Sequence, residues 1–554
     1  MGTDIKRPYP IIAAYTLHIG ALHFSYYLEV MKQLTTTNLK CLVIAGLLQW
    51  AFLAPGAIAQ KPDTSIINQM LNEANQHSQL KQMGHELLDN IGPRLVGTPQ
   101  MKQAADWAVN TFKSWGVNAQ IQNWGTWRGW ERGITHVDLI SPRVRSLEAM
   151  QLAWSGSTRG KTVTAEVIAL PEVADSIAFA KWLPAVKGKF VLISMPQLTG
   201  RPDYNWDEFG TKESVEKMKK ERNEQSDAWN KRMKNTGLKA ADLAKALEKA
   251  GAAGIFSSYW SRAFGANKIF GAQVKNIPTI DIGLEDYGLL WRMAETGQKP
   301  TVSVRADAKE LGIVPTFNVI AELKGTEKPE EYVILSAHFD SWDGGSGATD
   351  NGTGSLVMME AMRLLKKYYP NPKRTILVGL WGSEEQGLNG SRAFVEDNPA
   401  IVNHIQAVFN QDNGTGRVVS IQGQGFLNSY NYIGRWLSAV PQSIRQHIET
   451  SFPGMPGTGG SDFASFVAAG APAFSLSSNS WLYGTYTWHT NKDTYDKIVW
   501  DDVTNNAILT AVLAYMASED PQTASRTRIE MPLRNGEPGK WPEPKKANRK
   551  GGQD

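Results

Sequence analysis

From residue 316 onward, short apolar strand-like runs alternate with helical segments. The expected strands are 332–337 (YVILSA), 375–381 (TILVGLW), 407–409 and 473–476, and the expected helices are 355–368, 426–440, 462–469 and 503–516. Fully apolar strands alternating with helices are typical of a mostly parallel sheet with helices on both faces. The sequence therefore predicts an α/β fold for this part of the chain.

Polar side chains follow three of these strands at the point where each strand ends. In chain order, they are His338 and Asp340, Glu384 and Glu385, and Asp412. In open α/β sheets, binding sites form outside the carboxyl ends of the strands. We therefore expect these imidazole and carboxylate groups to converge at one edge of the sheet.

Each of these groups also has an ordinary structural interpretation. A single His-x-Asp at a strand end is more often a surface or capping feature than a ligand, and a Glu-Glu pair is more often solvated surface. Glu384 and Glu385, however, stand between an apolar strand and a Gly-rich turn, where adjacent side chains point in different directions. One carboxylate can then bind a metal while the other moves a proton. His404 and His447 lack such a setting, and we interpret both as structural or surface histidines.

Composition limits the partners of the chain. Of its 554 residues, 42% are hydrophobic and 20% are charged, and the formal net charge is +4. These values are typical of a globular protein, and because no basic stripe stands out, we expect no nucleic-acid partner. The length suffices for two domains with extensions.

Residues 1–59 have the features of a leader with a signal peptide. The apolar run Cys41–Ala54 is followed by Ala57-Ile58-Ala59, the small-x-small pattern that signal peptidases cleave. The run is short for a membrane span and contains Gln49. We therefore expect cleavage after Ala59, a secreted or periplasmic protein, and no stable membrane anchor after processing.

Other interpretations of this segment concern its start and its cysteine. Met31 begins a normal signal peptide on its own, so residues 1–30 could be an upstream mis-start. Cys41 could indicate a lipoprotein, but Asn38-Leu39-Lys40 does not resemble a lipobox. Because Cys41 is the only cysteine, cleavage would leave no disulfide and no thiolate ligand, and any metal would be held by histidines and carboxylates.

Four sequence blocks resemble the co-catalytic zinc aminopeptidase and glutamate carboxypeptidase family. In the family's order, they are HFDSWDGGSGATD (338–350), WGSEEQG (381–387), QD (411–412) and HTNKDT (489–494). The His-x-Asp-Ser-Trp-Asp form and the upstream WERG (130–133) most resemble the plasma glutamate carboxypeptidase (carboxypeptidase Q) branch. The resemblance covers approximately residues 64–520.

This resemblance implies a site with two Zn²⁺ ions per chain. His338 and Asp412 would bind one zinc, and Glu385 and His489 would bind the other. Asp350 would bridge the two ions, since a carboxylate offers two oxygens and offsets the charge of paired dications. The ions would share a water or hydroxide.

The resemblance also assigns supporting roles to nearby acids. Glu384 would act as general base, taking a proton from the water and passing it to the leaving amine. Asp340 would accept the other ring N–H of His338 and fix its tautomer. Asp493 could act similarly near His489.

Two positions depart from the family's pattern. Asn351 stands where many relatives have a second acid, which lowers the local charge. Trp488 stands where family aminopeptidases often place a Tyr whose hydroxyl stabilises the tetrahedral intermediate. That role could pass to the indole of Trp488, to Tyr486 or to Tyr483, and the sequence does not choose between them.

The domain organisation also follows from the resemblance. A zinc-exopeptidase (phosphorylase/hydrolase-like) domain would comprise residues 60–135 and 311–525, with an inserted protease-associated domain at 136–310 and a disordered tail at 526–554. Before the insertion we expect helices at 64–90 and 101–115. Within it we expect strands at 163–170, 189–194 and 279–282 and helices at 212–234 and 240–249.

Together these features favour a zinc exopeptidase that hydrolyses dipeptides or short peptides from a free N-terminus. Glu384 and Asp412 could hold the substrate's α-amine. A carboxypeptidase specific for C-terminal glutamate, the main alternative, would need clustered arginines, whereas Arg392, Arg417 and Arg435 are scattered. A glutaminyl cyclase normally lacks the insertion, and a non-enzymatic receptor would have lost ligands.

The expected partner is a peptide substrate. A homodimer is compatible with the sequence, which does not determine the oligomeric state.

Overall fold

The computed structural model describes residues 63–533 and 536–552. The expected leader, residues 1–59, lies outside this range, so its cleavage stays a prediction. Within the described residues, no helix combines the length and the apolar character that a membrane crossing requires.

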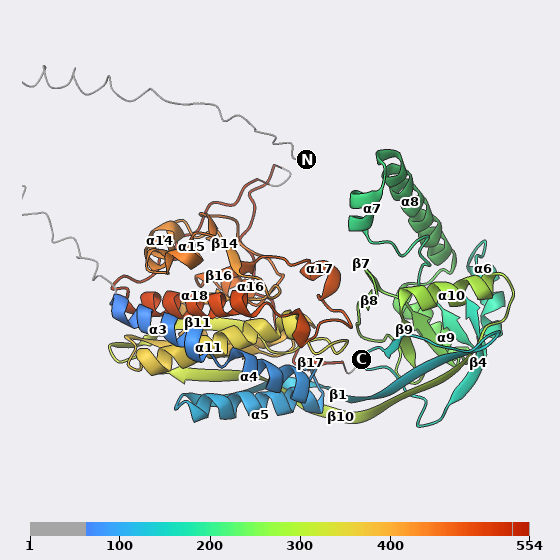
Figure 1. The fold of residues 1–554 in the computed structure, drawn as a ribbon, viewed down its shortest axis with the longest axis horizontal. Helices are drawn as coiled ribbons and strands as arrows, with labels where there is room; N and C mark the ends of the chain where they lie inside the picture. The colour runs from blue at the N-terminus through green and yellow to red at the C-terminus, as the bar shows by residue number, and fades with distance from the viewer. Residues whose placement is uncertain (1–62, 534–535, 553–554) are drawn as a thin grey trace, which may run out of the picture. The chain divides into compact units, whose positions relative to one another are not determined.

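A mixed sheet with a parallel centre, here called the main sheet, forms the largest core (Figure 1). Its four central strands pair in parallel in the order β16-β13-β11-β12, while β10 beside β12 and β14 beside β16 are antiparallel. The bounds are β10 Thr301–Leu323, β11 Lys328–His338, β12 Arg374–Trp381, β13 Ile405–Asn410, β14 Val418–Gln422, β15 Glu449–Ser451 and β16 Ala473–Ser478. The predicted α/β fold with a mostly parallel sheet is confirmed.

Helices cover both faces of the main sheet, which explains why its strands are apolar throughout. Val333 and Leu335 in β11 belong to the core under one set of helices, and Ile334 between them belongs to the core on the opposite face. The first face carries α3 (Thr64–His77), α5 (Pro99–Ser114), α11 (Thr353–Tyr368), α14 (Ser429–Ser438) and α18 (Trp500–Glu519). The second carries α12 (Asn389–Asp397), α13 (Pro399–Asn403) and α16 (Phe463–Ala468).

The helix expected at 64–90 is interrupted in the structure. α3 ends at His77, and the Ser78 hydroxyl accepts a hydrogen bond from the Leu80 N–H. The chain then continues as α4 (Leu80–Gly84) and a π-helical turn, η2 (His85–Ile91). A serine that bonds local backbone in this way competes with helix continuation, and apolar periodicity alone does not reveal such a break.

Two long strands lead from the main sheet into the insertion. β1 (Asn118–Ser141) and β10 pair antiparallel along almost their whole length, and Figure 1 shows them as one continuous ribbon. β10 pairs with β12 at residues 319–323 and with a strand of the insertion at residues 301–304. The expected domain boundaries at residues 136 and 310 therefore fall inside paired strands and not in linkers.

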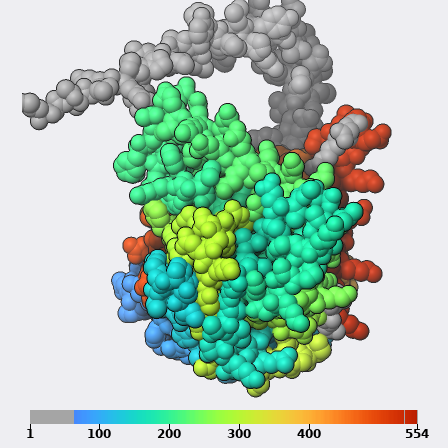
Figure 2. All heavy atoms as spheres, turned by 90° about the vertical axis from the view of Figure 1, so that its right-hand side faces the viewer, coloured from blue at the N-terminus to red at the C-terminus, as the bar shows by residue number. Residues whose placement is uncertain are grey.

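Residues 142–300, here called the inserted region, form a smaller α/β layer. In Figure 2 this region faces the viewer, coloured teal to green. Its parallel strands are β4 (Val163–Ala169), β5 (Phe190–Leu192), β6 (Gly254–Ser257) and β9 (Thr279–Ile282), with β3 (Ala149–Gln151) antiparallel at the edge. Phe190 and Phe256 stack in its core at 4.8 Å between ring centroids. The charged helix α8 (Lys212–Asn235) buries only Met218, as a solvated helix should. That this layer is a protease-associated domain stays a prediction.

The C-terminal tail differs from the prediction. We expected residues 526–554 to be disordered, but the described residues 526–533 and 536–552 pack against the rest of the chain. The Trp541 indole N–H donates to the Val467 carbonyl at 2.9 Å, and its ring lies 5.5 Å from that of Phe426. β17 (Lys550–Gly551) pairs with β1. A few specific contacts hold this Pro-, Gly- and Lys-rich segment, whose only regular element among the described residues is the two-residue strand β17, and composition cannot reveal such contacts.

Candidate metal centre

All five side chains expected to bind metal converge at the carboxyl edge of the main sheet. They come from the end of β11 (His338), the turn η4 at Ala348–Gly352 (Asp350), the segments after β12 (Glu385) and β13 (Asp412), and the segment after α17, Tyr483–Tyr486 (His489). They form two groups, His338–Asp350–Asp412 and Asp350–Glu385–His489, and within each group the candidate ligand atoms lie within 4.8 Å of one another. Asp350 belongs to both.

The distances around Asp350 explain why it is shared. His338 Nε2 lies 3.3 Å from Asp350 Oδ1 and 3.1 Å from Asp412 Oδ1. His489 Nε2 lies 3.3 Å from Asp350 Oδ2 and 2.9 Å from Glu385 Oε2. The two oxygens of Asp350 thus face different imidazoles, which is the arrangement expected of a carboxylate that bridges two metal ions.

The electrostatics of this centre also fit metal ions. Burial raises the pKa of Glu385 well above its usual value, and the nearby charge of Asp350 raises it further. Among the described atoms, Glu385 Oε1, Asp350 Oδ2 and His489 Nδ1 have no hydrogen-bond partner. Clustered buried carboxylates are costly unless a cation neutralises them. Imidazole and carboxylate donors are those that zinc accepts.

Asp493 holds the turn that carries Asp350. Its carboxylate accepts the backbone N–H of Thr349 at 2.8 Å and that of Asp350 at 3.0 Å. The structure shows no hydrogen bond from His489 to Asp493, since His489 Nδ1 has no hydrogen-bond partner among the described atoms and the Asp493 oxygens accept N–H groups of the turn. The sequence placed Asp493 near His489, but it could not show that a turn more than 140 residues earlier lies closer.

Asp340 is buried beside His338, but its role differs in detail from the prediction. His338 Nδ1 lies 2.9 Å from the main-chain carbonyl of Asp340, while the Asp340 carboxylate is 3.8 Å away. That carboxylate instead accepts the backbone N–H groups of Glu384 at 2.9 Å and Glu385 at 3.3 Å. Asp340 thus orients the histidine through its carbonyl and fixes the Glu384–Glu385 loop through its side chain.

Glu384 belongs to neither ligand group, although it lies beside them. Burial raises the pKa of Glu384 well above its usual value, and Asp412 and Asp462 raise it further, while His338 lowers it. Asp462 was not predicted from the sequence. It is fully buried, neither of its carboxylate oxygens has a hydrogen-bond partner among the described residues, and burial raises its pKa to about 7. Its position after Gly459-Gly460-Ser461, at the start of a helix, was the available signal.

A cavity of about 510 Å³, here called the polar cavity, opens at this centre. It is lined by the five candidate ligands and by Glu384, Gly387, Leu388, Arg392, Asn413, Thr458, Gly459, Gly460, Tyr483, Trp488 and Lys545. Two positively charged side chains, Arg392 and Lys545, therefore share a cavity with the carboxylate cluster.

The structure separates the three aromatic residues that the sequence could not rank. Trp488 and Tyr483 line the polar cavity. Burial raises the pKa of Asp350, but hydrogen bonds from His338 and Tyr483 help to hold it below its usual value. The Tyr486 hydroxyl instead donates to the Tyr204 hydroxyl of the inserted region at 3.0 Å. The expected role of Tyr486 at the site is therefore not supported, because its hydroxyl is engaged outside the cavity.

The inserted region reaches the metal centre through three consecutive residues. Lys268 Nζ lies 3.7 Å from the centroid of the Trp488 ring. The Ile269 N–H donates to the His489 carbonyl at 2.8 Å, and the Phe270 ring lies 5.4 Å from the His489 imidazole. These contacts position the loop that carries His489, and no sequence pattern predicts them.

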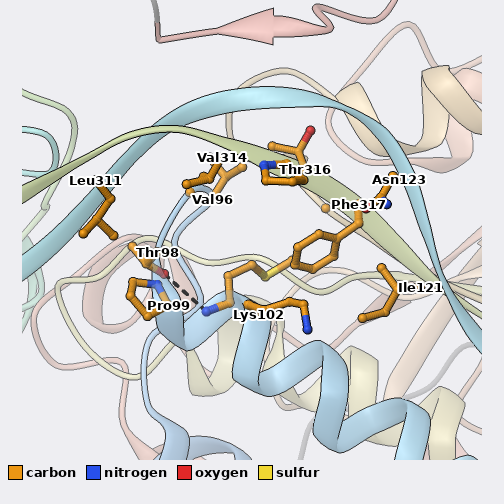
Figure 3. Close-up of a pocket in the computed structure, with 14 residues that line it drawn as sticks. Val96, Thr98, Pro99, Lys102, Ile121, Asn123, Leu311, Val314, Thr316 and Phe317 are labelled. Carbon is orange, nitrogen blue, oxygen red and sulfur yellow. Dashed lines mark hydrogen bonds between the residues drawn. The ribbon is translucent and has the colours of Figure 1, made fainter.

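A second cavity, of about 520 Å³ and here called the apolar cavity, lies between α5 and the β1–β10 ribbon (Figure 3). Its lining includes Val96, Thr98, Pro99, Met101, Lys102, Ile121, Leu311, Val314, Phe317 and Gly382. Lys102 is the only titratable side chain among its described lining residues, and its ammonium lies 2.6 Å from the Asp106 carboxylate. Its described lining therefore contains no histidine, cysteine or carboxylate that could bind a metal or act as a general base.

Comparisons with known proteins agree with this arrangement. Residues 318–514 match Peptidase family M28. The chain is 27% identical over 463 residues to Carboxypeptidase Q of Rattus norvegicus, which covers 84% of this chain and 90% of that protein. The structure of a Peptidase M28 precursor from Shewanella amazonensis SB2B superposes with a TM-score of 0.60 at 23% identity, covering 85% of this chain and 99% of that chain. BSAP, a zinc aminopeptidase from Bacillus subtilis, superposes with a TM-score of 0.51 at 20% identity, covering 81% and 97%.

Proposed function

Because this chain is a metallopeptidase whose residues 318–514 match peptidase family M28, we propose that it is a zinc-dependent exopeptidase acting on dipeptides or short peptides with a free N-terminus. The observation that carries the proposal is the position of Asp350, whose two oxygens face His338 and His489 separately. A site for a single ion would not need one carboxylate in two ligand groups.

Two zinc ions account for every ligand in the cluster. His338 and Asp412 would hold one ion, Glu385 and His489 would hold the other, and Asp350 would be shared by both. When bound, zinc supplies Lewis acidity, which polarises the scissile carbonyl and lowers the pKa of water. The choice of zinc is supported by the imidazole and carboxylate donors and by the likeness in fold to a zinc aminopeptidase.

Glu384 moves the proton in this proposal. Its carboxylate takes a proton from the attacking water and delivers it to the leaving amine. A pKa raised by burial suits this role, because the carboxylate then binds a proton more readily near neutral pH. The hydrogen bonds that the Glu384 and Glu385 N–H groups donate to the Asp340 carboxylate fix this base relative to its neighbouring ligand.

The remaining polar groups of the cavity bind the substrate. The α-amine of the peptide lies near the carboxylates of Glu384 and Asp412. Tyr483 lines the cavity, and its hydroxyl is the better candidate for stabilising the oxyanion. Trp488 offers an indole N–H for the same purpose.

Metal analysis of the purified protein tests this proposal. We expect two zinc ions per chain, loss of peptidase activity with a chelator and its return with zinc. Full activity with one ion or none would contradict the two-zinc site. Equal rates on free and N-acetylated dipeptides would instead contradict the preference for a free N-terminus.

Export is a separate proposal, based on the signal-like segment that ends at Ala59. Protein recovered outside the cytoplasm should begin at Gln60 or its cyclised form, as mass spectrometry can determine. An intact N-terminus in an extracted membrane fraction would indicate an anchor instead.

A further inference from the structure

The C-terminal tail is fixed to the main sheet on both sides of Lys545. Before it, Trp541 donates to the Val467 carbonyl at 2.9 Å, and the Arg528 guanidinium lies 4.6 Å from the centroid of the Trp541 ring. After it, Arg549 pairs with Asp397 in α12 at 2.7 Å. The backbone is thus held on both sides of Lys545. These contacts of the tail position Lys545 at the wall of the polar cavity.

Lys545 and Arg392 of α12 belong to the same cavity wall. Both line the polar cavity, and both also line an adjoining cavity of about 200 Å³. In the described part of the chain, neither side chain makes an ion pair or a side-chain hydrogen bond. The two other arginines near the signature blocks are paired elsewhere, Arg417 with Asp502 at 2.9 Å and Arg435 with Asp520 at 2.7 Å.

We propose that Arg392 and Lys545 form a carboxylate-binding subsite of the polar cavity, so that the C-terminal tail completes the substrate site. Cationic groups without a partner, in a cavity that also holds the carboxylates of the metal centre, fit an anionic group on the bound molecule. Arginine and lysine are the side chains that bind carboxylates through charge-assisted hydrogen bonds. The inference rests on the proposed peptidase function and adds the group that the tail recognises.

The distribution of charge in the cavity gives the subsite a direction. Glu384 and Asp412 suit the α-amine of a peptide, and the two cations suit a carboxylate on the same molecule. That carboxylate can be the C-terminus of a dipeptide or an acidic side chain at the second position. The chemistry is the same, and the experiment separates the two sources.

The test compares full-length variants on four substrates that all release leucine. Leu-Ala and Leu-Ala-amide differ only in the C-terminal carboxylate, and Leu-Glu-amide and Leu-Gln-amide differ only in the side-chain carboxylate. The variants are Lys545→Met and Arg392→Met. The matched control is Lys546→Met, which removes the same charge from the neighbouring exposed residue that does not line either cavity.

We expect the wild type to favour the carboxylate member of one pair by about tenfold or more in kcat/KM. A hydrogen bond between charged groups contributes enough free energy for a difference of this size. Preference within the Leu-Ala pair identifies the C-terminus, and preference within the Leu-Glu pair identifies the side chain. Lys545→Met and Arg392→Met should bring that ratio close to one, while Lys546→Met should retain it. The ratio within a pair cancels any general loss of activity, and exposed Lys545 can be changed without disturbing the core.

Other outcomes distinguish the two proposals. If the wild type hydrolyses these peptides but both ratios are the same in Lys545→Met and Arg392→Met as in the wild type, the subsite is overturned and the peptidase proposal stands. If the wild type releases leucine from none of the four substrates, the result contradicts the proposed exopeptidase function, and the subsite proposal that rests on it is overturned as well.

Discussion

The polar and apolar cavities have almost the same volume, about 510 and 520 Å³, but only one can support catalysis. The polar cavity lies where parallel strands of the main sheet end, so side chains from several strands meet there. The apolar cavity lies against α5 and the sides of β1 and β10, and its lining comes mainly from apolar side chains. The volume of a cavity therefore does not locate the functional site, whereas the convergence of titratable groups does.

The two cavities are also close along the chain. Gly382 lines the apolar cavity, and Glu384 and Glu385 line the polar one. The segment after β12 thus has one cavity at its beginning and the other at its end. Substitutions on the two sides of this segment can show whether the cavities are independent in function.

The largest effect should come from removing the shared ligand. Asp350→Asn should abolish detectable peptidase activity and lower the zinc content from two ions to one or none, because both ligand groups lose a charged oxygen. Zinc content and turnover of the purified variant measure this. Asp106→Asn, the same chemical change beside the apolar cavity, is the control and should retain both ions. Two tightly held zincs in Asp350→Asn would rule out the bridging role.

Removal of the general base should affect turnover alone. Glu384→Gln should lower kcat by about 10²–10⁴-fold, with zinc content and melting temperature almost unchanged, because Glu384 is in neither ligand group. Glu385→Gln should instead lose zinc. If Glu384→Gln lost zinc and Glu385→Gln retained it, the two roles would have to be exchanged.

A smaller effect is expected for the residue that fixes the Glu384–Glu385 loop. Asp340→Asn places a donor where the carboxylate now accepts two N–H groups, so the loop should lose its fixed position. Loss of such support typically costs about 10–100-fold in metal affinity or activity. The zinc concentration needed to restore half of the activity after chelation measures this, and an unchanged value would show that Asp340 is dispensable.

The smallest effect should come from the apolar cavity. The Thr98 hydroxyl accepts the Met101 N–H at 3.3 Å and caps α5, so Thr98→Ala should lower the free energy of unfolding by about 1 kcal/mol. Its kcat/KM should equal that of the wild type. Thr111→Ala in the same helix is the control, since its hydroxyl only bonds the Trp107 carbonyl within the helix. A tenfold change in kcat/KM for Thr98→Ala would mean that the two cavities are coupled.

Much of the metal centre was predictable from the sequence, because its position follows from strand order. His338, Glu385 and Asp412 follow apolar strands, and strands paired in parallel bring their ends to one edge. The details that depend on backbone geometry were not predictable. The backbone conformation at Asp340 decides whether its carbonyl or its carboxylate contacts His338. No sequence pattern predicts that conformation.

The parts that the sequence missed depend on contacts between distant segments. Lys545 shares the polar cavity with Arg392, which precedes it by more than 150 residues, and it lies within a stretch that has no periodic pattern. Tyr204 accepts a hydrogen bond from Tyr486, and these two residues are even farther apart along the sequence. The length of β1 was also missed, because register shifts at 123–125 and 132–135 interrupt its alternation.

The antiparallel pairing of β1 with β10 bears on how an inserted region could be gained or lost. Ser141 and Thr301, where the inserted region leaves and rejoins the ribbon, are paired neighbours. A short hairpin turn could therefore join them directly, and a gene without the intervening codons would still encode an uninterrupted ladder. Such a shortened chain would keep the main sheet and every candidate metal ligand. It would lose Ile269, whose N–H supports the His489 carbonyl, and would have to hold that loop by other means.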